Sequence, residues 1–199
     1  MGSRTMRGFS LIEMMSTVTI ILVVSGVAIL GIQPAVRYSR INNAYNITLG
    51  AIRQARDYSV AQRQEYSVTF SNAAVPNTIT ITQTGTGNVI DTYPLPTDVS
   101  FTTINGIPTA ANAVPDGFGA GAVAIDFDQG VTGGVKNVIY FMPDGTGQDV
   151  NGNINNGVIY LARGGELDSS HAITVWGATG RLRGWRLFFN NGAAYWREN

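Results

Sequence analysis

One carboxylate stands alone in the most apolar part of this chain. Glu13 is the only charged residue between Phe9 and Ile32. A carboxylate in such a segment is costly unless it has a partner, so it is a candidate functional residue. With Ser10 it also has the spacing of a capping box, in which a hydroxyl and a carboxylate bond the first unpaired N–H groups of a helix. The residues alone leave both interpretations open, a helix cap and a functional acid.

The apolar run from Val18 to Ile32 is the element that must position Glu13. Roughly 20 apolar residues in a helix span the hydrocarbon core of a bilayer, which is about 30 Å thick. The segment before it, residues 1–8, is polar and carries two arginines, which favours a cytoplasmic N-terminus. Two further arginines follow the run at Arg37 and Arg40, and they weaken this indication of orientation.

The spacing of apolar residues predicts one long helix over residues 9–63. Its first part, residues 9–35, is apolar all round and is expected to be a transmembrane or filament-core segment. Residues 36–63 are amphipathic, with apolar residues at steps of three and four. The apolar face carries Ile41, Tyr45, Leu49, Ile52 and Ala55, and the opposite face carries Asn42, Asn43, Asn46, Arg53 and Asp57. Pro34 predicts a kink near Leu30 to Pro34, with simple tolerance of the proline as the alternative.

After residue 63 the apolar period changes to two, which predicts a globular β domain over residues 64–199. The predicted strands are 66–70, 78–82, 89–93, 99–104, 122–127, 137–142, 158–162, 172–176 and 181–189. Residues 84–88 are expected to form a hairpin turn, and residues 105–121, rich in Gly and Pro, an irregular loop. The predicted fold class is α+β: a long N-terminal α-helix packed on a C-terminal antiparallel β-sheet domain. The amphipathic half of the helix is expected to cover one face of the sheet.

Composition narrows the classes of function. The 199 residues have a formal net charge of zero, but by region the net charge is +5 over residues 1–63, −8 over 64–170 and +3 over 171–199. The acidic middle argues against a surface that binds nucleic acid all over, although a local basic patch stays possible. Cysteine is absent, which excludes disulfides and thiolate metal sites.

A basic run near the C-terminus is the best candidate for binding. Arg181 and Arg183 point to the same face of an extended strand, and Arg186 follows them. Guanidinium groups on one edge can clamp phosphates, and Trp185 could stack on a base, so these arginines are a candidate DNA-binding site. The alternative is a solvated final hairpin with Trp185 and Phe188 in the core.

The remaining polar residues predict no catalytic or metal site. The loop over residues 144–153 is rich in oxygen ligands, but an EF-hand counted from Asp149 fails, because Ile154 replaces its glycine and Tyr160 its closing glutamate. An Asp/Asn/Gly turn is the favoured interpretation. His171 is the only histidine, and its neighbours in sequence cannot converge on it as a triad. We expect no enzyme, no cofactor and no metal.

The segment Arg7-Gly8-Phe9-Ser10-Leu11-Ile12-Glu13 resembles the recognition sequence of type IV prepilins and pseudopilins. In that family a membrane peptidase cuts after the glycine and methylates the new N-terminal residue. The resemblance implies loss of residues 1–8 as a leader peptide, cleavage between Gly8 and Phe9, and N-methylation of Phe9. It also implies an assembly role for Glu13, which would meet the amine of a neighbouring subunit.

Four further segments, in their order along the chain, resemble the GspH/FimT group of minor pilins and pseudopilins. They are residues 49–70, 139–147, 173–176 and 179–183. The resemblance implies a type IV pilin-like fold and a structural subunit that prepilin peptidase processes. Such a subunit crosses the bacterial inner membrane once, with its globular domain outside the cytoplasm. It then packs with other pilin or pseudopilin subunits into a helical type IV pilus or type II secretion pseudopilus.

Two alternative roles follow from the same resemblance. Gly180-Arg181-Leu182-Arg183 resembles a C-terminal motif with which some minor pilins hold DNA during uptake, which implies a DNA-binding minor pilin with DNA as a partner. The other alternative is a major, self-assembling pilin.

Overall fold

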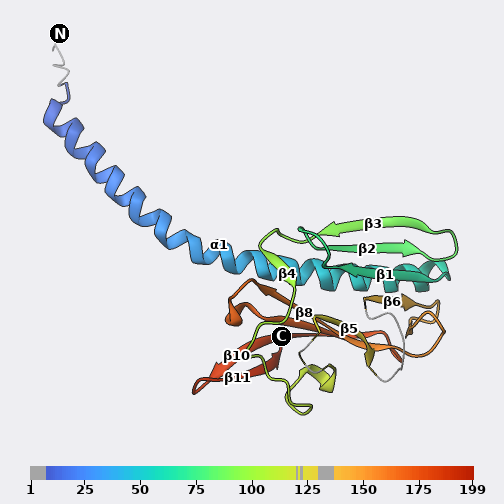
Figure 1. Cartoon of the computed structure of the whole chain (residues 1–199). Coiled ribbons are helices and arrows are strands. Elements are labelled where there is room, and N and C mark those ends of the chain that lie inside the picture. Colours follow the sequence, from blue (N-terminus) through green and yellow to red (C-terminus); the bar gives the residue numbers. More distant parts are fainter. Residues whose placement is uncertain (1–7, 120, 122, 130–136) are drawn as a thin grey trace, which may run out of the picture. The chain divides into compact units, whose positions relative to one another are not determined.

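A computed structural model describes residues 8–119, 121, 123–129 and 137–199 of the chain (Figure 1). The chain divides into two units, Met1–Ser39 and Arg40–Asn199. One helix, α1, runs from Leu11 to Gln62 and contributes to both units. The sequence predicted this helix over residues 9–63, so its observed ends differ from the prediction by no more than two residues.

The first unit contains the apolar half of α1. The segment Leu11–Ala28 is long and apolar enough to cross a membrane, with a mean hydropathy of 2.0 and none of it buried within the protein. Helical structure continues through Pro34 without interruption. The kink near Pro34 stays a prediction. The expected leader, apart from Gly8, lies outside the described residues.

The second unit contains two antiparallel sheets, where the sequence predicted one. In the first, the strand order is β3-β2-β1-β6-β7; in the second it is β11-β10-β9-β8-β4, and β5 also pairs with β8. The first sheet comprises β1 (Tyr66–Ser71), β2 (Thr78–Gln83), β3 (Asn88–Pro94), β6 (Val138–Phe141) and β7 (Gly147–Gln148). The second comprises β4 (Val99–Phe101), β5 (Ile125–Gln129), β8 (Asn156–Arg163), β9 (His171–Trp176), β10 (Arg181–Asn190) and β11 (Ala193–Glu198).

The half of α1 in this unit contacts both sheets, and Figure 1 draws it between β1–β3 and β8–β10. On one side Gln54 donates a hydrogen bond of 3.0 Å to Asp91 in β3. On the other side Gly184 in β10 packs so closely against Tyr45 that an added Cβ atom would overlap the tyrosine hydroxyl. The helix therefore covers an inner face of each sheet rather than one face of a single sheet.

The main core forms where α1 and the two sheets meet. The predicted apolar face of the helix is confirmed, because Ile41, Tyr45, Ile52 and Ala55 are buried and Leu49 is partly buried. On the predicted polar face Asn43, Asn46, Arg53 and Asp57 are exposed, and Asn42 is partly buried. Phe70 of the first sheet lies 5.4 Å from Phe127 and 5.7 Å from Phe101 of the second, measured between ring centroids. Aromatic packing therefore joins the two sheets directly as well.

A smaller core covers the outer face of the second sheet. The loop after β4 brings Ile107 and Phe118 against Tyr160, Leu187 and Trp196. This loop is irregular, as predicted, apart from a short 3₁₀ turn, η1 (Pro115–Gly117); a second, η2 (Leu167–Ser169), precedes β9. The sequence missed two strands, the short β7 and the final β11, and it placed the end of β4 three residues too late.

Candidate functional site

The N-terminal turn of α1 holds the residues with the strongest sequence signal. Phe9 is 76% exposed, and Glu13 is exposed one turn later. The backbone N–H groups of Glu13 and Met14 each donate to the carbonyl of Ser10, at 3.1 Å. Neither the Ser10 hydroxyl nor the Glu13 carboxylate has a side-chain partner among the described residues, so the capping box does not form. Among the residues that the structure describes, the Glu13 carboxylate therefore has no partner.

The surface around Glu13 is almost wholly apolar. Exposed fractions of 52–78% are found for Leu11, Ile12, Met14, Met15 and Val18. The hydroxyls of Ser16, Thr17 and Thr19 donate to helix carbonyls three or four residues earlier, which hides their polarity. An exposed helix of this kind is stable in lipid or against other apolar helices, and not in water.

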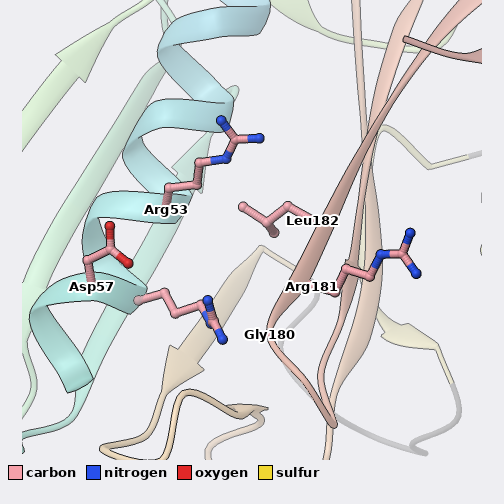
Figure 2. A pocket seen from close by; sticks show the side chains of 6 residues that line it. Arg53, Asp57, Gly180, Arg181 and Leu182 are labelled. Carbon is pink, nitrogen blue, oxygen red and sulfur yellow. The ribbon is translucent and has the colours of Figure 1, made fainter.

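A second candidate is a cavity of about 230 Å³ between α1 and the turn that joins β9 to β10 (Figure 2). Its lining residues are Arg53, Arg56, Asp57, Gly180, Arg181 and Leu182. The guanidinium of Arg56 donates to the carbonyls of Gly145 and Thr179, at 3.2 and 3.1 Å. These bonds hold Arg56 to two turns of the protein itself, so it fastens the helix to the second unit's loops.

Figure 2 shows Leu182 directed toward α1 and the side chain of Arg181 directed away from it. Arg53 and Asp57 have no hydrogen bond or ion pair with the described residues. The cavity is therefore lined by two exposed side chains of opposite charge, Arg53 and Asp57, and by Arg56, whose hydrogen bonds are to the protein's own turns. This charge arrangement could hold a small anion only weakly, because the exposed groups are solvated.

Arg183 makes the most extensive polar contacts of the basic run. Its Nη1 atom lies 2.6 Å from Oδ1 of Asp116, and its Nε atom lies 3.1 Å from Glu198. The other carboxylate oxygen of Asp116 accepts hydrogen bonds from the Thr174 hydroxyl at 2.5 Å and from the Trp176 indole at 3.1 Å. The hydrogen bond to Asp116 is the main cause that raises the pKa of Arg183. We call these contacts of Asp116 the Asp116 clasp.

The basic run consequently does not form one patch. Arg181 and Arg183 share the outer face of β10, as predicted, but Asp116 and Glu198 already engage Arg183. Arg186 pairs in register with His171, and side chains alternate along a strand, so Arg186 lies on the opposite face, with Gly184. The DNA-binding role of the three arginines stays a prediction, and only Arg181 and Arg183 share a face of β10.

Two other polar residues have structural partners. His171 is 1% exposed, its Nδ1 lies 2.8 Å from the Ser169 carbonyl, and burial lowers its pKa. Asp149 accepts hydrogen bonds from the backbone N–H groups of Asn151 and Asn153 and from the Asn153 amide, and these bonds lower its pKa. The interpretation of this loop as an Asp/Asn turn is thus confirmed. Within the described residues, no group of three or more His, Asp or Glu side chains could hold a metal ion.

Sequence reasoning missed Asp116 altogether. The signal available was an acid between a proline and a glycine in a loop otherwise poor in charge. Its backbone has φ of 52°, a conformation that Asp adopts more readily than most residues.

Comparison with known proteins identifies one matching family model. Residues 3–29 match the prokaryotic N-terminal methylation motif. Among solved structures, the chain is similar to the type IV minor pilin FimU of Pseudomonas aeruginosa, with 11% identity over 76% of this chain and 89% of that chain and a TM-score of 0.44. No curated protein matches. The matched motif includes Gly8, Phe9 and Glu13 and most of the apolar segment.

Proposed function

We propose that this chain, type IV pilin-like in its N-terminal methylation motif, is a structural subunit of a type IV pilus or of a type II secretion pseudopilus. It enters the bacterial inner membrane through Leu11–Ala28, with the second unit outside the cytoplasm. Prepilin peptidase cleaves between Gly8 and Phe9 and methylates Phe9. The subunit then joins other pilin-like subunits in a helical filament, as a minor pilin or pseudopilin.

The observation that carries this proposal is that the matched methylation motif includes an apolar helix with no buried residue. The family model covers residues 3–29, and the segment Leu11–Ala28 has no buried residue. A helix that only anchored a globular domain would need no processing motif ahead of it. A helix that must first sit in lipid and then pack with sister helices needs both its apolar surface and a defined N-terminal residue.

The role proposed for Glu13 follows from charge. Cleavage gives Phe9 a free amine, which is cationic near neutral pH and stays cationic when methylated. A single charge in an apolar surrounding is costly, whereas opposite charges there attract strongly. The carboxylate of Glu13, which has no partner among the described residues, can therefore pair with the amine of a neighbouring subunit and favour its correct axial position.

Mass spectrometry of the protein purified from its native host tests the processing step. We expect an N-terminus at methylated Phe9 in the mature protein and a chain that keeps residues 1–8 in cells that lack prepilin peptidase. A mature protein that retains residues 1–8 in cells with active peptidase would overturn the proposal.

A further inference from the structure

The cavity between α1 and the β9–β10 turn has an excess of positive charge. Three arginines line it against one acid, Asp57. Arg56 is occupied by backbone carbonyls, and the side chain of Arg181 is directed away from α1. Arg53 is exposed and has no hydrogen bond or ion pair with the described residues, and Figure 2 shows it extending from α1 on the side that faces Leu182. The chemistry of this guanidinium group fits a carboxylate.

The second unit also has an exposed acid of the opposite kind. Asp168, in η2, is exposed and has no hydrogen bond or ion pair with the described residues. Asp57 and Glu65 also lack such a partner, but both lie near the C-terminal end of α1, as the cavity does. The acids of this unit that do have partners include Asp91, Asp98, Asp116, Asp144, Asp149, Glu166 and Glu198.

Strand β9 separates Asp168 from the cavity. Asp168 precedes this strand, whose first residue, His171, packs against Tyr45 with ring centroids 5.4 Å apart. At its other end β9 brings Trp176 into register with Arg181, which lines the cavity. About 17 Å of extended strand lies between these two ends. An ion pair between Asp168 and the cavity therefore needs two copies of the chain.

A contact between two different surface features of identical chains repeats in one direction. Such a head-to-tail contact builds an open helical filament when its rotation does not close into a ring. Exposed charges hold each other weakly, but opposite charges at an interface fix its register and exclude wrong arrangements. A charge pair of this kind therefore suits a subunit whose other contacts supply most of the affinity.

We propose that Arg53, at this cavity, pairs with the Asp168 carboxylate of a second copy, and that this head-to-tail contact fixes the register of neighbouring second units. The charge of the two regions favours the pairing, because residues 1–63 have a net charge of +5 and residues 64–170 a net charge of −8. A small free anion is the other occupant that this chemistry allows, and the test below separates the two. The inference rests on the proposed function, because assembly brings the copies together.

The absence of cysteine makes a direct test simple. The full chain with Arg53→Cys and Asp168→Cys is produced in its native host, and sheared filaments are treated with a short bis-maleimide cross-linker. We expect a ladder of dimers, trimers and larger species from this double variant, and no ladder from either single variant, because the contact joins two different sites. Arg53→Cys/Val150→Cys is the matched control, since Val150 is exposed in the loop after β7.

Exchange of the charges gives a second measurement that does not depend on cysteine. Arg53→Asp and Asp168→Arg should each lower incorporation into filaments several-fold, and the combined variant should restore it. A free anion as the only occupant would give the loss with Arg53→Asp and no restoration. Incorporated double-cysteine chains without a ladder, or no restoration in the combined variant, would overturn the inference and leave the proposed function intact. An unsubstituted chain that enters no filament would overturn both.

Discussion

Asp116 and Arg183, which are 67 residues apart in the chain, form an ion pair of 2.6 Å between the loop after β4 and the outer face of the second sheet. The same carboxylate binds Thr174 and Trp176, so it connects this loop to two neighbouring strands. The side chain of Asp116 is 4% exposed. An arginine that the sequence offers as a ligand for phosphate is thereby part of the protein's own structure.

The Asp116 clasp should contribute measurably to stability. Asp116→Asn keeps the size and the tolerance of positive φ but removes the charge, and hydrogen bonds to a charged group contribute about 2 kcal/mol. We expect the free energy of unfolding of the full chain in detergent to fall by about that amount. Arg181→Ala is the matched control, since Arg181 is exposed and has no side-chain partner among the described residues; its effect should be within about 0.5 kcal/mol. Equal effects of the two substitutions would contradict the role given to the clasp.

The contact between Gly184 and Tyr45 predicts opposite effects of alanine at two glycines. In Gly184→Ala the new methyl group overlaps the Tyr45 hydroxyl, and such overpacking costs about 1–3 kcal/mol. Gly50 is exposed in the helix and has no atom near an added Cβ, so Gly50→Ala should stabilise by about 0.5–1 kcal/mol. Both are measured by thermal unfolding. Adding Tyr45→Phe should recover part of the loss at Gly184, and no recovery would argue against this contact.

His171 should make stability depend on pH. Burial holds its pKa in the folded state below the ordinary value near 6.5, so the unfolded chain binds a proton first as the pH falls. The free energy of unfolding should therefore decrease as the pH falls from about 6.5 to the lowered pKa. Unfolding by urea at pH 7.5 and 5.5 measures this. Because the chain has one histidine, His171→Gln should remove the decrease over this range; if the decrease persists, another group causes it.

Glu13 should matter for assembly and not for insertion. In Glu13→Gln the amide cannot form the ion pair with a neighbouring amine, so we expect loss of incorporation into filaments while membrane insertion and cleavage at Phe9 continue. Cross-linking and fractionation of sheared filaments measure both. Thr17→Val is the control, because the Thr17 hydroxyl donates to the carbonyl of Met14 within its own helix. Normal assembly of Glu13→Gln would contradict the proposed ion pair between Glu13 and the amine of a neighbouring subunit.

Local periodicity was sufficient to predict α1 and its buried face, because three- and four-residue steps report directly which side of a helix is apolar. It also located the strands from β1 to β10, apart from β7. It could not predict that the strands divide into two sheets, since pairing between strands distant in the chain leaves no local period. The final strand β11 was missed because its sequence, Ala193 to Glu198, lacks the β-branched alternation of the others.

The candidate sites also differ in how far the sequence alone could predict them. The processing motif is contiguous, so its residues could be named from the sequence. The state of Arg183 depends on Asp116, which comes from a loop with no regular pattern, and only the folded chain brings the two together. The split of Arg186 from Arg183 follows from counting along the strand: they are three residues apart, an odd step.

The position of α1 between two sheets determines how the second unit responds to a pull on the N-terminal half of the helix. Tension that enters at Arg40 passes into the contacts at Tyr45 and on to the bonds that Arg56 makes with Gly145 and Thr179. Because these contacts are spread along the helix, a pull along its axis loads them in shear, and they must yield together. The arrangement therefore resists extraction of the helix far better than a helix peeled from one surface would.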